Sequence, residues 1–223
     1  VGSDMCVIDR SGGPTAVINA SLYGVVTESL KHDEEIDTVY GMVNGIEGFL
    51  ADHYLDLSHT LGSRELELLK LTPAAYLGSC RFKLPEDLNS EVYRTLFRKF
   101  EALNIGYFFY IGGNDSMDTV SKLSRYAAAV KSGIRVIGVP KTIDNDLWGT
   151  DMTFGFQSAV NVATHAIDCI HTTAASHGRV FIVEVMGHKV GWLTLNAGIA
   201  GGADIILIPE IPYDLDKVAA KIR

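Results

Sequence analysis

Short runs of apolar residues alternate with longer amphipathic segments along most of this chain. The short runs are rich in β-branched and aromatic residues, which is typical of strands, and lie at Met5–Ile8, Thr38–Met42, Tyr107–Ile111, Val136–Val139, Val180–Val185 and Ile205–Ile208. The segments between them have helical spacing and predict helices at Pro14–Lys31, Arg64–Leu71, Asn89–Leu103, Ser116–Lys131 and Gln157–Thr173, with Asn89 as an N-cap. Strand runs that are almost continuously apolar indicate a sheet covered on both faces. The pattern therefore predicts an α/β fold with a doubly wound, mostly parallel sheet and helices on both faces.

The length, net charge and cysteine content of the chain limit its domain organisation and the kinds of molecule that it can bind. The 223 residues are enough for one medium domain or two small ones. The net charge of -8 argues against a nucleic-acid or anionic-membrane partner, and no apolar run approaches the roughly 20 residues that a membrane span needs. The cysteines Cys6, Cys80 and Cys169 are odd in number and lack CxxC spacing, which indicates reduced thiols and a cytoplasmic protein. An anionic ligand would need a local positive site or a metal.

Two glycine-rich turns follow strand candidates and open helices: SGGP at 11–14 and GGNDS at 112–116. Such turns let backbone N–H groups approach phosphate oxygens, and the helix N-terminus adds about half a positive charge. Neither turn matches GxxxxGK[ST] or GxGxxG, and each taken alone is more typical of a plain strand-to-helix connection than of a phosphate site. Both are expected at the carboxyl ends of parallel strands, where open α/β sheets bind ligands, so together they indicate a phosphate site.

The segment KTIDND at 141–146 follows the fourth strand candidate. Asp144 and Asp146 are two residues apart, so one could accept a proton from a substrate hydroxyl while the other helps to hold Mg²⁺ or to orient the donor, with Lys141 offsetting phosphate charge. The alternative is a solvated turn whose Asx side chains cap their own backbone. Arg81 and Arg179 are candidate phosphate ligands, although each taken alone is more typical of an ordinary surface ion pair.

With these residues assembled, the chain resembles the phosphofructokinase family over essentially its whole length. The matching blocks are SGGPTAVINA at 11–20, GMVNGIEG at 41–48, LGSCRF at 77–82, GGNDS at 112–116, PKTIDND at 140–146, GFQSAV at 155–160, SHGR at 176–179, EVMGHKVGWL at 184–193 and AGGAD at 200–204. The resemblance implies transfer of a phosphoryl group to the 1-hydroxyl of fructose 6-phosphate with Mg²⁺, a step of glycolysis. It also implies a homodimer or homotetramer.

The resemblance carries roles onto matching positions. Asp144 would be the general base, with Lys141 and Asp146 beside it in the catalytic segment. The sugar phosphate would contact residues of three segments, and Arg179 would reach the 6-phosphate in a neighbouring subunit's site; the positions are Thr142, Ile143, Asp144, Arg179, Met186, Gly187 and His188. The donor would lie against Gly12, Gly13, Arg81, Gly113, Asp115 and Ser116, and Asn114 would face the metal.

Three departures from the family pattern bear on the activity. The pattern usual in ATP-using members at 112–116 is GGDGS, whereas this chain has Asn114 and Asp115. An aspartate where the α-phosphate of ATP would lie is bulky and repulsive, and Lys141 in place of the usual glycine can neutralise a small donor, so this chain resembles the pyrophosphate-dependent branch. His188 stands where the family usually has arginine, with Lys189 as the neighbouring cation. The chain also stops inside a helical pattern that starts at Tyr213.

Residues 1–223 are therefore expected to form the donor-binding α/β domain and the start of the sugar-phosphate domain, with the remainder of the second domain outside this chain. Other activities stay open at this point. The first is an ATP-dependent enzyme of the same family, and the second is a non-catalytic sugar-phosphate-binding regulatory subunit. More remote are NAD kinase-like or lipid kinase-like folds, which share a GGDG-type loop but lack PKTIDND and EVMG.

Overall fold

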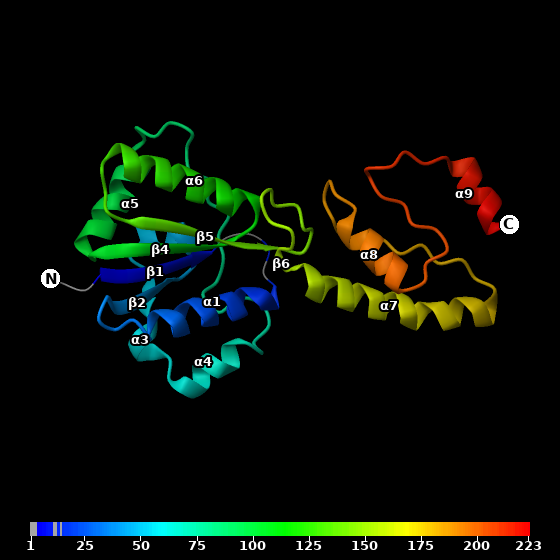
Figure 1. The fold of residues 1–223 in the computed structure, drawn as a ribbon, viewed down its shortest axis with the longest axis horizontal. Helices are drawn as coiled ribbons and strands as arrows, with labels where there is room; N and C mark the ends of the chain where they lie inside the picture. Colours follow the sequence, from blue (N-terminus) through cyan, green and yellow to red (C-terminus); the bar gives the residue numbers. More distant parts are fainter. Residues whose placement is uncertain (1–3, 11–12, 14) are drawn as a thin grey trace. The chain divides into compact units, whose positions relative to one another are not determined.

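The computed structural model describes residues 4–10, 13 and 15–223, which separate into two compact units, Val1–Lys141 and Thr142–Arg223 (Figure 1). The strands are β1 (Asp4–Arg10), β2 (Ile36–Met42), β3 (Tyr54–Asp56), β4 (Ile105–Gly112), β5 (Arg135–Thr142) and β6 (Phe154–Gly155). The helices of the first unit are α1 (Ala16–Ser29), α2 (Gly45–Leu50), α3 (Leu57–Thr60), α4 (Ser63–Leu69), α5 (Glu91–Ala102) and α6 (Asn114–Ala129). Those of the second unit are α7 (Phe156–His177), α8 (Trp192–Ala200) and α9 (Leu215–Ile222).

The sheet has the strand order β3-β2-β1-β4-β5-β6. The central strands β2, β1, β4 and β5 run parallel, and β3 is antiparallel to β2. In this register Arg10 lies opposite Ile111 and Gly112 lies opposite Pro140. Strands β1, β4 and β5 therefore finish at one edge of the sheet, called here the carboxyl edge.

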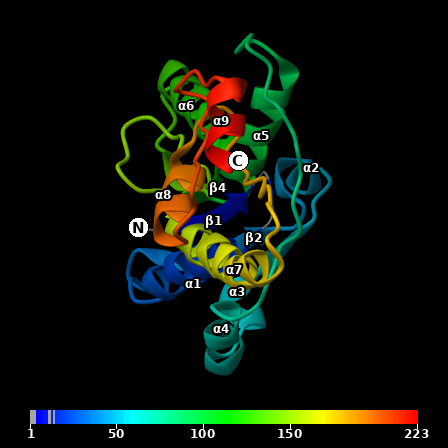
Figure 2. The ribbon, with the colours of Figure 1, turned by 90° about the vertical axis from the view of Figure 1, so that its right-hand side faces the viewer.

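Helices cover both faces of this sheet, because alternate strand residues bury into separate apolar clusters. On one face Val7, Phe108 and Tyr110 pack with residues of α2, α5 and α6, such as Phe97 and Leu123. On the other face the alternate residues of β1 pack with α1, α3 and α4, through Leu22, Val26, Leu57, Leu66 and Leu69. Figure 2 shows α5 and α6 on one side of the strands and α1 and α4 on the other. The predicted doubly wound, mostly parallel α/β sheet is confirmed.

Strands β1, β2, β4 and β5 and the longer helices of the first unit lie within a few residues of their predicted bounds. The N-cap predicted at Asn89 is wrong. Helix α5 begins at Glu91 with Ser90 as its N-cap, and Asn89 instead donates its backbone N–H and its side-chain amide to Oδ1 of Asp87, at 2.9 and 3.0 Å. Short elements such as α2, α3 and β3 were not predicted, because three to six residues carry too little periodicity.

In the second unit α7 packs against α8, and Phe156, Val160 and Leu193 form a small buried cluster. Helix α7 is 22 residues long, yet no helix in the described part of the chain is long and apolar enough to cross a membrane. The strands predicted at Val180–Val185 and Ile205–Ile208 are wrong: both segments lack regular secondary structure. Ile182 is 95% exposed, so the apolar side chains of its segment are not buried as a sheet strand would require.

Candidate functional site

The carboxyl edge of the first unit brings three predicted donor-site segments together. Lys141, at the end of β5, is buried and donates from Nζ to the carbonyl oxygen of Gly13 at 2.9 Å. Gly113 follows β4, and a Cβ built there would lie 3.4 Å from the carbonyl oxygen of Lys141. The glycine after β1, the glycine after β4 and the lysine of β5 are therefore neighbours. Gly12, the remaining predicted donor contact of the first turn, lies outside the described residues.

Helix α6 starts at this edge with Gly113 as its N-cap. The N–H groups of Ser116 and Met117 both donate to the carbonyl oxygen of Gly113 at 3.0 Å, and Ser116 is 1% exposed. Asn114 and Asp115 are exposed in the first turn. A helix N-terminus carries partial positive charge, so a cationic lysine and a helix end meet at the same edge, an arrangement suited to phosphate.

Asp115 faces a cation that the sequence did not single out. Its Oδ1 lies 3.2 Å from Nζ of Lys83, and both side chains are mostly exposed. Lys83 belongs to a segment without helix or strand that joins Leu77 to α5 and that also carries Arg81. Arg81 is exposed. The exposed Lys83–Asp115 pair itself contributes little to stability, but it shows that a positive and a negative side chain lie beside the N-terminus of α6.

The loop Thr142–Thr153 of the second unit holds the predicted base. The N–H of Asp144 donates to Oγ1 of Thr142 at 3.1 Å, and Oγ1 of Thr153 donates to the carbonyl oxygen of Thr142 at 2.7 Å. Asn145, in the left-handed conformation at φ 56°, accepts from the N–H of Thr153 at 2.8 Å through Oδ1. These bonds close the loop on itself and fix the backbone of Asp144.

Asp144 and Asp146 are both half-buried, and Oδ1 of each is enclosed by protein. The turn predicted as an alternative for DND is therefore present in part, because Asn145 caps the backbone of its own loop. The loop thus combines a turn with two carboxylates on a fixed backbone, and a fixed carboxylate is what proton transfer requires.

A shared apolar cluster connects this loop to the predicted sugar segment. Ile143 and Val185 both pack against Phe156, Val160 and Leu193. Asp144 directly follows Ile143 and Met186 directly follows Val185, so the backbones of both residues lie next to this cluster. A Cβ added to Gly187 would lie 2.4 Å from the carbonyl oxygen of Val190, so only glycine fits that turn. His188 is exposed with φ 55°, in the left-handed region.

Arg179 lies at the other end of α7. Its N–H donates to the carbonyl oxygen of Ala174 at 3.0 Å, directly after the left-handed Gly178 that ends the helix. Ile143 packs on the first turns of α7, whereas Arg179 follows its last turn, and 22 helical residues span about 33 Å. Arg179 is therefore too far away to serve the same site as Asp144 within one subunit.

Oxygen ligands for a metal are available at the start of α6. In the described ranges no three His, Cys, Asp or Glu side chains gather into a cluster that could hold a metal by themselves. Mg²⁺ commonly binds through one or two protein oxygens together with substrate phosphates and waters. The exposed amide of Asn114 and carboxylate of Asp115 fit that type of site.

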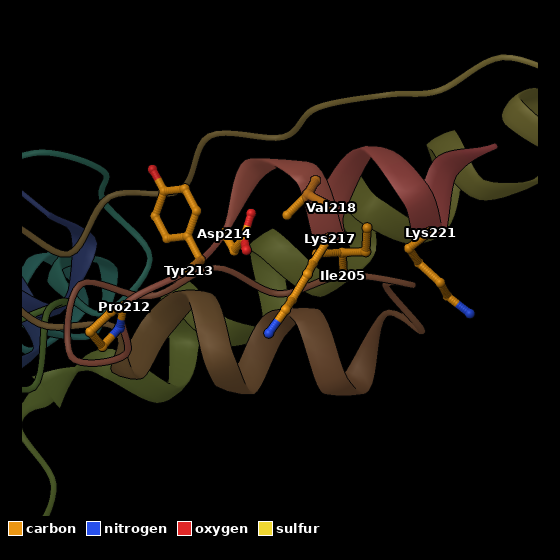
Figure 3. A pocket seen from close by; sticks show the side chains of 7 residues that line it. All are labelled: Ile205, Pro212, Tyr213, Asp214, Lys217, Val218 and Lys221. Atoms are coloured by element: carbon orange, nitrogen blue, oxygen red, sulfur yellow. The ribbon is translucent and has the colours of Figure 1, made fainter.

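A separate surface pocket of about 510 Å³ lies beside α9. Its lining includes Tyr213, Asp214, Lys217 and Lys221. In Figure 3 the two lysine side chains point apart and the tyrosine ring points away from both. Polar groups that do not converge are a poor site for a specific anion, so this pocket is not a candidate active site.

Sequence reasoning missed Lys83 and Lys122. Lys122 is 4% exposed, although lysine is rarely so buried. Its partners include a residue 36 positions earlier, which no local pattern connects to it. Only the spacing of Asp118 and Lys122, one helical turn apart, gave a signal, and that spacing is common on ordinary exposed helices.

Comparison with known proteins agrees with this geometry. The chain is 40% identical over 221 residues to an ATP-dependent 6-phosphofructokinase of Spirochaeta thermophila, which covers 96% of this chain and 57% of that protein. It is 39% identical over 222 residues to a pyrophosphate–fructose 6-phosphate 1-phosphotransferase of Rhodospirillum rubrum, and this match covers 97% of this chain and 54% of that protein. The crystal structure of a pyrophosphate-dependent phosphofructokinase from Marinobacter aquaeolei superposes with a TM-score of 0.88 at 39% identity, over 98% of this chain and 56% of that one.

The chain thus spans a little over half the length of these relatives. Their names divide between ATP and pyrophosphate as donor. The phosphofructokinase family model matches residues 5–223, which is nearly the whole chain. The match extends through both units, and this chain belongs to the phosphofructokinase family.

Proposed function

We propose that the full-length protein transfers a phosphoryl group from pyrophosphate to the 1-hydroxyl of fructose 6-phosphate, giving fructose 1,6-bisphosphate and phosphate. The observation that carries the choice of donor is Asp115. It occupies the first turn of α6 at the carboxyl edge, and it is paired with Lys83. A carboxylate there would repel and obstruct the α-phosphate of ATP, whereas pyrophosphate has no nucleoside to accommodate.

Lys141 supports the same choice. Its buried ammonium group is held by the carbonyl oxygen of Gly13, beside the start of the α6 helix. A fixed cation at this position would stabilise the negative charge that develops on the leaving phosphate. Gly12, Gly13, Gly113, Ser116 and Arg81 would complete the donor site.

For the acceptor, the carboxylate of Asp144 would take the proton of the 1-hydroxyl as its oxygen bonds to phosphorus and the bridging P–O bond of pyrophosphate breaks. Thr142 and Thr153 hold the backbone of Asp144, and Asp146 would orient groups beside it. Ile143, Met186, Gly187 and His188 would line the sugar site, and Arg179 would bind the 6-phosphate in a neighbouring subunit of a homodimer or homotetramer. Mg²⁺, held by Asn114 and donor oxygens, would neutralise phosphate charge.

The test is steady-state kinetics of the full-length protein with fructose 6-phosphate and with either pyrophosphate or ATP. We expect turnover with pyrophosphate. Asp115→Gly should raise kcat/KM for ATP because it removes the charge and bulk, and Lys141→Gly should mainly lower turnover with pyrophosphate. The double variant should favour ATP most.

Use of ATP by the wild type without turnover of pyrophosphate would refute the donor assignment. The protein would then be an ATP-dependent 6-phosphofructokinase, the name carried by the relative from Spirochaeta thermophila. Absence of turnover with both donors, together with binding of fructose 6-phosphate, would instead indicate a regulatory subunit.

A further inference from the structure

Lys122 is a buried ion-pair partner in the first unit. Its ammonium group lies 2.7 Å from Oδ2 of Asp118 and 2.6 Å from Oε1 of Glu86, and it donates to the carbonyl oxygen of Leu84 at 3.2 Å. Asp118 and Lys122 both belong to α6, whereas Leu84 and Glu86 belong to the irregular segment before α5. One buried cation therefore ties that segment to the helix.

Two further contacts hold the same short segment. Leu84 is 3% exposed and belongs to the apolar cluster under α5 and α6. The buried Tyr93 donates its hydroxyl to the carbonyl oxygen of Pro85 at 2.6 Å. Each of residues 84–86 thus has its own contact: Leu84 packs in the apolar cluster, Pro85 accepts from a tyrosine, and Glu86 pairs with Lys122. The two carboxylates, Asp118 first and Glu86 second, raise the pKa of Lys122, so it stays charged at neutral pH.

The residue immediately before this anchored segment is Lys83, which lies beside Asp115 at the N-terminus of α6. Lys83 is exposed, and an exposed ion pair does not by itself fix a lysine side chain. The position of its backbone is set by the anchor at residues 84–86. Two residues of α6, two turns apart, thus contact the same stretch of chain. Lys122 contacts Leu84 and Glu86, and Asp115 contacts Lys83.

We propose that Lys122 is a positioning residue for the phosphoryl donor: it holds residues 84–86 on α6, so that Lys83 stays beside Asp115 and offsets part of its charge where the donor binds. Pyrophosphate is highly anionic, and an uncompensated Asp115 would repel it. The proposal rests on the proposed function for the place where the donor binds. It does not depend on which donor is used.

The experiment measures kcat and both KM values of full-length Lys122→Met, Lys122→Arg and Lys83→Ala, with the donor that the wild type is first found to use. Lys122→Met keeps an unbranched side chain one atom shorter but removes its charge and its three donors. We expect it to raise the donor KM about tenfold to a hundredfold, since small displacements in a site cost this much. The KM for fructose 6-phosphate should stay within twofold, and Lys122→Arg should recover most of the loss.

Coupling through Lys83 separates positioning from general stability. If Lys122 acts through Lys83, the double variant Lys83→Ala/Lys122→Met should have the donor KM of Lys83→Ala alone. Lys70→Met, which removes an exposed ion pair with Glu67, is the matched control and should leave both KM values unchanged. Additive effects of the two substitutions would overturn the proposal.

Glu86→Gln keeps the test decisive if Lys122→Met does not fold. Glu86 is largely exposed, so its substitution leaves the core intact and weakens only the link between segment and helix. We expect a rise in donor KM in the same direction but smaller. An unchanged donor KM in this variant, or an equal rise in both KM values with a lower melting temperature, would assign Lys122 a structural role only. A wild type that uses ATP refutes the pyrophosphate assignment but not this proposal, which is judged by the ratio of variant to wild type.

Discussion

Replacing Asp144 by asparagine tests the predicted base with little change of shape. The carboxylate becomes an amide that cannot accept the proton, while the hydrogen bond that fixes this residue runs from its backbone N–H to Thr142 and is unaffected. The bonds that Thr153 makes to Thr142 and Asn145 are unaffected too. The loop should therefore keep these bonds, and the substitution should act mainly on proton transfer.

General base catalysis typically contributes about 10²–10⁴-fold to the rate. Asp144→Asn should accordingly raise the barrier by roughly 2.7–5.4 kcal/mol, at about 1.36 kcal/mol for each factor of ten. We expect kcat to fall by this factor while the KM for fructose 6-phosphate changes by less than about threefold, since the lost interaction belongs to the transition state. Asp151→Asn, at an exposed position of the same loop, is the control.

The assay follows formation of fructose 1,6-bisphosphate through coupled aldolase and NADH oxidation, alongside thermal unfolding of each variant. Turnover of Asp144→Asn at the level of the wild type would remove Asp144 from the role of base. A fall in kcat accompanied by a clearly lower melting temperature would show that the loop, and not proton transfer, had been changed. An equal fall in kcat in the control Asp151→Asn would likewise show that the loop had been changed.

Two further predictions concern single side chains. Arg179→Ala should raise the KM for fructose 6-phosphate roughly tenfold to a hundredfold, because a charge-assisted pair contributes about 1.5–3 kcal/mol, and an unchanged KM would leave Arg179 as an ordinary surface residue. Burial raises the pKa of the Cys6 thiol to about 12, so its reactive thiolate is scarce at pH 8. Iodoacetamide should therefore modify the exposed Cys169 in the native protein but Cys6 only in denaturant, and mass spectrometry would detect the modified residues. Rapid native alkylation of Cys6 would contradict its burial.

The candidate site was predictable where local sequence sets the backbone. The glycines after β1 and β4 and the lysine of β5 were predicted at one edge because each follows or ends a strand of a parallel sheet, and the contact between Lys141 and Gly13 agrees with that prediction. The base loop was predictable as a motif, but the hydrogen bonds of Thr153 that stabilise it were not. Lys83 and Lys122 could not be found either, since their partners come from segments that only folding brings together.

The second unit shows why a strand cannot be predicted from its own residues alone. Val180–Val185 has more β-branched and aromatic residues than β1, and it was predicted with the same rule. Strand propensity mostly reflects packing on a pleated surface between neighbours, and an unpaired strand leaves a row of N–H and C=O groups without partners. β1 has β2 and β4 on its two sides, whereas Val180–Val185 has no paired strand among the described residues, and neither has Ile205–Ile208. The pattern therefore identified segments that are able to form strands, and the availability of a neighbour decided which of them did.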